Sequence, residues 1–200
     1  MKIKNLPVKY KKIWEKCQPL LKKGRADDLL HAAQVVEKIL AYKGKIKIDR
    51  EVLIPVAMMH DIGHSAILKR HLKYVTGEFK IVNGKLVHML AGAKIAEDIL
   101  TAVKYDNRKI KEIADIISMH DADQLSGIDK KRIYDTVNRK FFHDIDSLDR
   151  YNEKRIKKFS IYFKNKEKIF EFLEKGIENF FYQEFKEKAR ESFENIKYED

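Results

Sequence analysis

Cysteine, proline and glycine are scarce in this chain. Its 200 residues include one cysteine, three prolines and eight glycines. Cys17 alone excludes an internal disulfide and a metal cage built from several thiolates, and a reducing cytoplasm is the simplest location. The scarcity of proline and glycine leaves long stretches without a helix breaker, which favours an α-helical fold.

Long apolar runs are absent as well. No stretch approaches the roughly 20 apolar residues that a membrane-spanning helix needs. The basic start of the chain is followed by neither an apolar stretch nor a small-residue cleavage site, so we expect no signal peptide and no membrane partner. A chain that is 44% hydrophobic and 36% charged has the composition of a folded, soluble protein. Its length fits a single domain.

Most of the excess of basic over acidic residues lies near the N-terminus. The net charge is +11, and residues 1–25 hold nine Lys or Arg and one Glu, a net charge of +8. This basic arm can attract nucleic acid or anionic metabolites over a long range. The alternative is that its lysines serve solubility alone.

Hydrophobic residues recur at helical spacing through most of the chain. Tyr10, Ile13, Trp14 and Cys17 predict a first helix, which Pro19 should end or kink.

Two further helices follow. Asp27 and Asp28 open the second, since acidic residues favour the positive end of the helix dipole. The third, from Glu51 to about Asp61, is apolar on every side and therefore belongs in the middle of the fold. Pro55 is tolerable there only in the first turn.

One segment breaks the helical pattern. Residues 79–82 and 85–87 flank Asn83-Gly84, a strong hairpin signal that predicts a small two-stranded excursion. Helices are then predicted over residues 88–103, 108–120 and 130–151. They are followed by a stripe of apolar residues at three- and four-residue spacings: Phe170, Leu173, Ile177, Phe181, Phe185, Ala189 and Phe193.

The prediction is therefore an all-α, single-domain helical bundle with a small β-hairpin near residues 79–87. It consists of a basic N-terminal helix and arm (1–24), a helical core (25–151) and aromatic-rich C-terminal helices (152–200). The C-terminal helices either pack on the core or form a homodimer.

Histidines fall at informative places. The seven histidines are His31, His60, His64, His71, His88, His120 and His143. His60 and Asp61 close the apolar third helix, where ionisable groups are costly unless they are paired or bind metal. His120 lies on the core face of its helix, Asp146 lies near a buried stripe, and His31 borders an apolar arc. Four helices that each deliver a His or an Asp towards the core indicate a metal site.

The order of these residues resembles a known family. His31, the doublet His60-Asp61 and Asp146 reproduce the His…His-Asp…Asp order of the HD superfamily of metal-dependent phosphohydrolases, and VLIPVAMMHDIGH is typical of it. The resemblance covers residues 25–150. It implies a bundle of helices that encloses a metal ion bound by His31, His60, Asp61 and Asp146.

The resemblance also bears on the number of ions. His88 and His120 lie between the doublet and Asp146, where members with two metals have two further histidine ligands. Asp61 then bridges the ions. In some one-metal members a histidine near these places binds phosphate, so one ion and two ions both stay open.

Residues after the doublet are candidates for catalysis and substrate binding. His64 is the third residue after Asp61, where relatives have a Glu, Lys or His that handles the leaving group or touches phosphate. A histidine suits proton transfer near neutral pH, and the alternative is a solvated loop histidine. Lys69, Arg70 and Lys94 are candidates to clamp phosphate oxygens.

The expected reaction is hydrolysis of a phosphate ester. Nitrogen and oxygen ligands suit Mn, Fe, Co, Ni, Zn or Mg, and a divalent ion lowers the pKa of bound water enough to give hydroxide at neutral pH. Asp61 can both bind metal and orient this nucleophile. His31 needs an acceptor for its other ring nitrogen, for which Asp27 and Asp28 are candidates.

A nucleotide or related small molecule is the substrate that the resemblance implies. The runner-up is a nucleic-acid phosphodiesterase, in which the basic arm binds nucleic acid and Tyr10 and Trp14 stack on bases. Core positions are the simpler expectation for these two aromatic residues. Two further alternatives are a non-catalytic HD protein that binds a nucleotide or serves as an adaptor, and a di-iron oxygenase.

Overall fold

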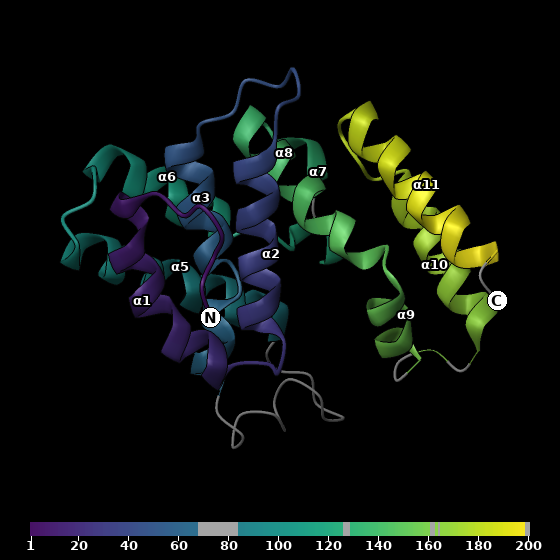
Figure 1. Cartoon of the computed structure of the whole chain (residues 1–200), viewed down its shortest axis with the longest axis horizontal. Coiled ribbons are helices and arrows are strands. Elements are labelled where there is room, and N and C mark those ends of the chain that lie inside the picture. Colours follow the sequence, from purple (N-terminus) through teal and green to yellow (C-terminus); the bar gives the residue numbers. More distant parts are fainter. Residues whose placement is uncertain (68–83, 126–128, 161–162, 164, 199–200) are drawn as a thin grey trace. The chain divides into compact units, whose positions relative to one another are not determined.

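The protein is helical, as predicted. The computed structural model describes residues 1–67, 84–125, 129–160, 163 and 165–198, and these residues contain no strand (Figure 1). The chain forms two compact units, Met1–Arg139 and Lys140–Asp200, which are described separately below. Among the described residues, no helix is long and apolar enough to cross a membrane.

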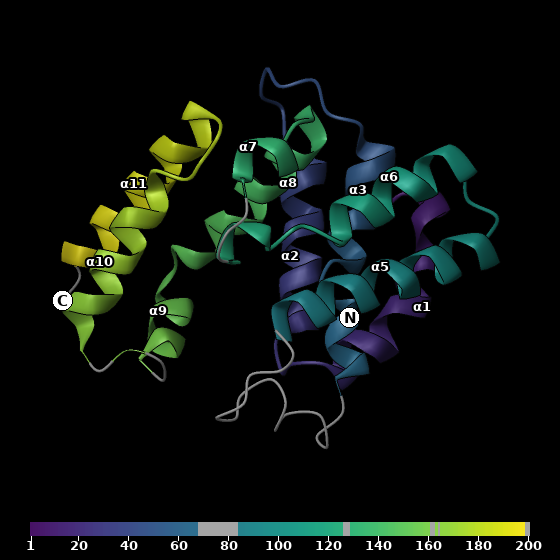
Figure 2. The same cartoon turned by 180° about the vertical axis from the view of Figure 1, so that it is seen from behind.

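The first unit is built around one apolar helix. Its elements are α1 (Val8–Lys23), α2 (Asp28–Ala41), α3 (Arg50–Met59), η1 (Ile62–Ala66), α5 (Gly84–Ala102), α6 (Asn107–Ile117), η3 (Ala122–Gln124) and α7 (Lys130–Ile133). Every residue of α3 from Val52 to Met59 is buried. The helix packs against α1, α2 and α6, while α5 lies beside α6 and η1 (Figures 1 and 2). The prediction that an all-round apolar helix lies in the middle of the fold is confirmed.

Pro55 lies within α3 beyond the first turn, so the prediction for its position was wrong. A proline has no N–H, and it therefore leaves the carbonyl four residues earlier without its helical donor. That carbonyl is Glu51 O, and it accepts a hydrogen bond of 2.6 Å from Tyr105 Oη. This side chain replaces the missing helical bond, which explains how α3 continues through the proline.

Helix α1 also continues through its proline, Pro19, so of the two outcomes predicted there, an end or a kink, the end does not occur. The predicted core face of α1 is confirmed, because its four residues are buried: Tyr10, Ile13, Trp14 and Cys17. Burial raises the pKa of the Cys17 thiol, which keeps it protonated and unreactive.

The predicted second strand of the hairpin is wrong. Residues 85–87 lie in the first turns of α5, and residues 79–83 lie outside the described residues. A short apolar run fits either period, and here it extends a helix whose buried residues follow at helical spacing: His88, Met89, Gly92, Ala96, Ile99 and Leu100.

The helix predicted over 130–151 is interrupted. It consists of α7, α8 (Val137–Ser147) and η4 (Leu148–Arg150). Thr136 Oγ1 accepts a hydrogen bond of 3.2 Å from Arg139 N, and Arg139 Nη1 donates to Ile133 O at 3.0 Å. These bonds satisfy backbone groups on both sides of the break, so one helix ends and a capped helix begins.

The second unit contains most of α8 together with η4, α9 (Glu153–Phe159), α10 (Lys166–Ile177) and α11 (Gln183–Tyr198). Much of the predicted apolar stripe is buried in it: Leu173, Ile177, Phe185, Ala189 and Phe193. The stripe is divided between α10 and α11.

Asp144, fully buried in α8, accepts hydrogen bonds from Phe181 N and Tyr182 N just before α11. His143 Nδ1 lies 2.9 Å from Asp144 Oδ1.

Candidate metal centre

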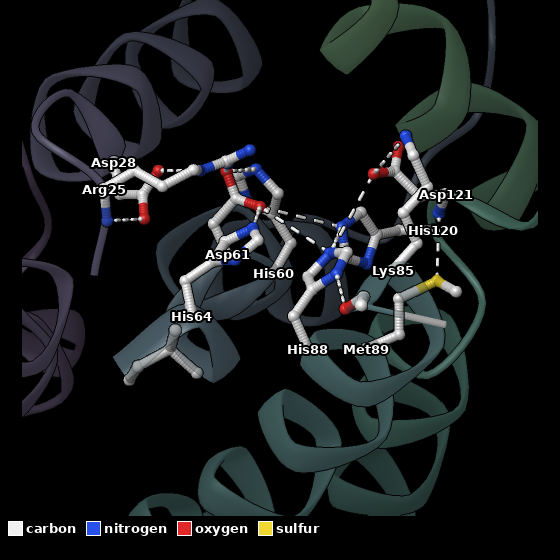
Figure 3. Close-up of polar contacts among 12 residues, drawn as sticks. Arg25, Asp28, His60, Asp61, His64, Lys85, His88, Met89, His120 and Asp121 are labelled. Carbon is white, nitrogen blue, oxygen red and sulfur yellow. Dashed lines mark hydrogen bonds and ion pairs between the residues drawn. The ribbon is translucent and has the colours of Figure 1, made fainter. Parts of the chain in front are cut away.

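Histidine side chains from distant parts of the first unit surround Asp61 (Figure 3). Two groups of three residues have ligand atoms that all lie within 4.8 Å of one another. The first group is His31, His60 and Asp61, and the second is Asp61, His88 and His120. All five residues are buried. The two groups therefore form one cluster, in which Asp61 is shared.

The imidazole Nε2 atoms approach the Asp61 carboxylate from several sides. His60 Nε2 lies 3.5 Å from Asp61 Oδ2, and the Nε2 atoms of His88 and His120 each lie 3.9 Å from Asp61 Oδ1. The His31 and His60 rings meet edge to face, with centroids 5.0 Å apart. The Asp61 carboxylate therefore lies between the His31–His60 pair and the His88–His120 pair.

Backbone carbonyls orient three of these rings. The Nδ1 atom of His60 lies 3.1 Å from Ala57 O, that of His120 lies 2.8 Å from Ile117 O, and that of His88 lies 3.4 Å from Gly84 O. A carbonyl oxygen only accepts, so Nδ1 carries a proton in each ring, and Nε2, which has a lone pair when the ring is neutral, faces the cluster. Metal-binding histidines in proteins are held in this way by a bond from the other ring nitrogen.

The packing of His88 against His120 fits a bound cation. Their Nε2 atoms are 3.3 Å apart. Burial, followed by the neighbouring His120 and His64, lowers the pKa of His88 to about 2, so this ring is neutral. Two imidazole nitrogens at this separation share either a proton, when one ring is protonated, or a cation, when both rings are neutral. Two nitrogen ligands about 2.1 Å from one ion in tetrahedral geometry are about 3.4 Å apart, which agrees with the observed separation.

The charge on Asp61 is stabilised by its neighbours. Burial alone would raise the pKa of this carboxyl, but His60 and Arg25 outweigh it and hold the pKa well below its ordinary value. Arg25 Nη2 donates to Asp61 Oδ2 at 2.5 Å, and Arg25 Nε donates to Asp28 Oδ1 at 2.7 Å (Figure 3). Asp61 is therefore an ionised ligand before any metal binds.

Glycines let η1 and α5 approach closely enough to assemble the cluster. A β-carbon on Gly63 would lie 1.8 Å from His88 O and 2.6 Å from Gly92 N. The close approach brings Asp61, on one segment, next to His88, on the other.

His64 lies at the edge of the cluster. Its ring stacks on the His88 ring, with centroids 4.2 Å apart, and its Nε2 lies 3.4 Å from Asp61 Oδ1. Only 15% of its side chain is exposed, so it is not a solvated loop residue. This predicted site residue is thus beside the shared carboxylate.

The other predicted residues have different locations. Lys94 forms ion pairs with Asp98 and Glu97 on the surface of α5, and it lies six residues after His88, about 9 Å further along the helix. The structure does not bring it to the cluster. Lys69 and Arg70 lie outside the described residues. Asp146 is a half-buried residue of α8 in the second unit, and its role as a ligand stays a prediction.

Two polar residues of the centre were missed. Arg25 contributes to the basic charge of the N-terminal region and also binds Asp28, a predicted candidate partner of His31. Asp121 Oδ2 lies 3.9 Å from His88 Nε2 and 4.0 Å from Lys85 Nζ. Its place directly after His120 repeats the His60-Asp61 pattern, and this repetition was a usable signal.

Comparison of the chain with protein-family models, with curated proteins and with solved structures found no match.

Proposed function

We propose that this chain is a metal-dependent phosphohydrolase of the HD type. The observation that carries the proposal is the pair of buried ligand groups that share Asp61, with histidine Nε2 atoms directed at its carboxylate. The order of the ligands along the chain, in which His31 precedes the His60-Asp61 doublet, supports the same conclusion.

The ligands can hold one or two divalent ions. His31, His60 and Asp61 would hold one ion, and Asp61, His88 and His120 would hold the other. The set offers nitrogen and oxygen and no sulfur, which suits Mn, Fe, Co, Ni, Zn or Mg. A bound ion supplies a nucleophile at neutral pH, by lowering the pKa of water, and offsets the charge on phosphate oxygens.

The residues around the ligands support this chemistry. Asp61 is ionised and held in place, so it can orient the attacking water. His64 lies 3.4 Å from Asp61 Oδ1 and is the more exposed neighbour, which suits a group that passes a proton to the leaving oxygen. The buried apolar residues of α3 exclude bulk water from one side of the site.

A small phosphorylated molecule, with nucleotides as the first class to test, is the proposed substrate. The runner-up activity on nucleic acid drew on Tyr10 and Trp14 as stacking residues. Both side chains are buried, with exposed fractions of 2% and 4%, and Trp14 Nε1 donates to Met1 O at 3.0 Å. They are therefore not available to stack on bases. Only the lysines of the arm still support activity on nucleic acid.

The test is hydrolysis of a panel of nucleotides and phosphate esters by the purified chain, with Mn, Co, Ni, Mg or Fe added one at a time. We expect phosphate release that requires metal and falls by at least about 100-fold in His60→Ala and Asp61→Asn. Asp98→Asn, which alters an exposed carboxylate on α5, is the matched control and should equal wild type.

Other results would redirect the assignment. Metal binding without hydrolysis of any ester would favour a non-catalytic nucleotide-binding or adaptor protein. Bound iron together with oxygen consumption would favour a di-iron oxygenase. Full activity in both site variants would exclude this cluster as the catalytic centre.

A further inference from the structure

Arg25 occupies a carboxylate oxygen that a bound ion would also use. Its Nη2 lies 2.5 Å from Asp61 Oδ2. Its Nε and backbone N donate to the two oxygens of Asp28 at 2.7 and 2.8 Å. Asp28 is buried, with 2% exposed, and therefore fixes the guanidinium group from the other side (Figure 3).

This ion pair makes the two halves of the cluster unequal. Asp61 Oδ2 is the oxygen closest to His60, and it is the one that Arg25 holds. Asp61 Oδ1 is the oxygen closest to His88 and His120. A divalent ion bound at Oδ2 would lie in contact with a positive guanidinium group, whereas an ion bound at Oδ1 would lie on the far side of the carboxylate from it.

We infer that Arg25 sets the order in which two ions bind. The first ion binds to Asp61 Oδ1 with His88 and His120. The second binds with His31 and His60 and requires the guanidinium group to leave Oδ2. This inference rests on the proposed metal centre and assigns to Arg25 a role in metal loading, as a competitor for one ligand atom.

The test separates the two halves and measures binding of Mn²⁺ alone to the full chain by isothermal titration calorimetry. His120→Ala removes a ligand of the Oδ1 half, so that the His31, His60 and Asp61 half is measured. His31→Ala leaves the other half. Arg25→Gln is then added to each background.

We expect Arg25→Gln to tighten Mn²⁺ binding about tenfold or more in the His120→Ala background, because a hydrogen bond between charged groups no longer competes. In the His31→Ala background we expect less than about threefold, since only the general loss of one positive charge acts there. Arg108→Gln removes one charge from an exposed pair with Asp106 and controls for that general effect.

Equal changes in the two backgrounds, or weaker binding in the first, would overturn the inference. Circular dichroism melting verifies that each variant is folded. Arg25→Lys keeps the charge but cannot bond Asp28 and Asp61 at the same time as the guanidinium group does. Its Mn²⁺ affinity should therefore lie between those of wild type and Arg25→Gln. Weaker binding by Arg25→Lys than by wild type would also overturn the inference. Failure of wild type to bind Mn²⁺ would refute the metal centre itself, whereas the expected affinities without ester hydrolysis would refute only the proposed activity.

Discussion

The carbonyl oxygen of His88 lies against the α-carbon of Gly63, so closely that a β-carbon there would be 1.8 Å from that oxygen. Real β-carbons do not approach backbone atoms so closely. Any side chain at residue 63 must therefore push η1 away from α5. Asp61 directly precedes η1, and His88 lies in α5.

Gly63→Ala should be strongly destabilising. We expect a loss of about 3 kcal/mol or more, because the clash is with backbone and cannot be relieved by rotating a side chain. Gly92→Ala, on the opposite side of the same contact, is the control. Its β-carbon would lie 3.3 Å from Ile117 Cγ2, and alanine favours the helix by about 1 kcal/mol. Urea denaturation of both variants gives the comparison, and similar losses would contradict the described packing.

Tyr105→Phe should cost about 1–2 kcal/mol, since it removes the donor to Glu51 O that Pro55 makes necessary. In a Pro55→Ala background, the helix supplies its own donor, and the cost of Tyr105→Phe should shrink. Tyr10→Phe removes a neighbouring hydroxyl that also interacts with Tyr105, and it should cost less because Tyr10 Oη reaches Arg50 O only at 3.4 Å. A double-mutant cycle by thermal denaturation measures the coupling, and an additive result would mean that the two residues act independently.

Asp144→Asn should destabilise the second unit by about 2–3 kcal/mol. The carboxylate accepts from Phe181 N, Tyr182 N and His143, and an asparagine would turn its amide hydrogens towards one of these donors. Asp129→Asn changes an exposed cap that accepts one bond from Lys131 N, and asparagine caps equally well. Hydrogen exchange of the α11 amides locates the effect, and unchanged protection there would refute this role for Asp144.

Glu51 should make stability depend on pH in the acidic range. Hydrogen bonds from Lys109 and then Lys9 lower the pKa of Glu51 from 4.5 to about 2. A lowered folded-state pKa means that its stabilisation is present above pH 4.5 and is lost as the pH falls towards 2. The difference in melting temperature between wild type and Glu51→Gln should therefore be largest above about pH 5 and shrink below it. Because these side chains are partly exposed, 0.5 M salt should reduce the difference, and a difference that does not vary with pH would contradict the assignment.

The helices and much of the cluster could be predicted from the sequence because each signal is local. Helical spacing places Tyr10 and Ile13 on a buried face, and the doublet His60-Asp61 follows an apolar helix. The contact between Arg25 and Asp61 could not be predicted, because the two residues are 36 apart in sequence and lie near each other only after folding. Likewise, the prediction of a strand over residues 85–87 was wrong, because three residues do not distinguish the period of a strand from that of a helix.

Two of the histidine rings proposed to bind metal are hydrogen-bonded to the ends of helices. His60 and His120 hydrogen-bond Ala57 O and Ile117 O, carbonyls in the last turns of α3 and α6. Helix ends open and close by local unfolding far more often than the whole protein unfolds. Each opening of these ends would release an imidazole, so a bound ion should hold both helix ends closed. Binding of the ion should therefore slow amide exchange in the final turns of α3 and α6, in residues that never touch the ion.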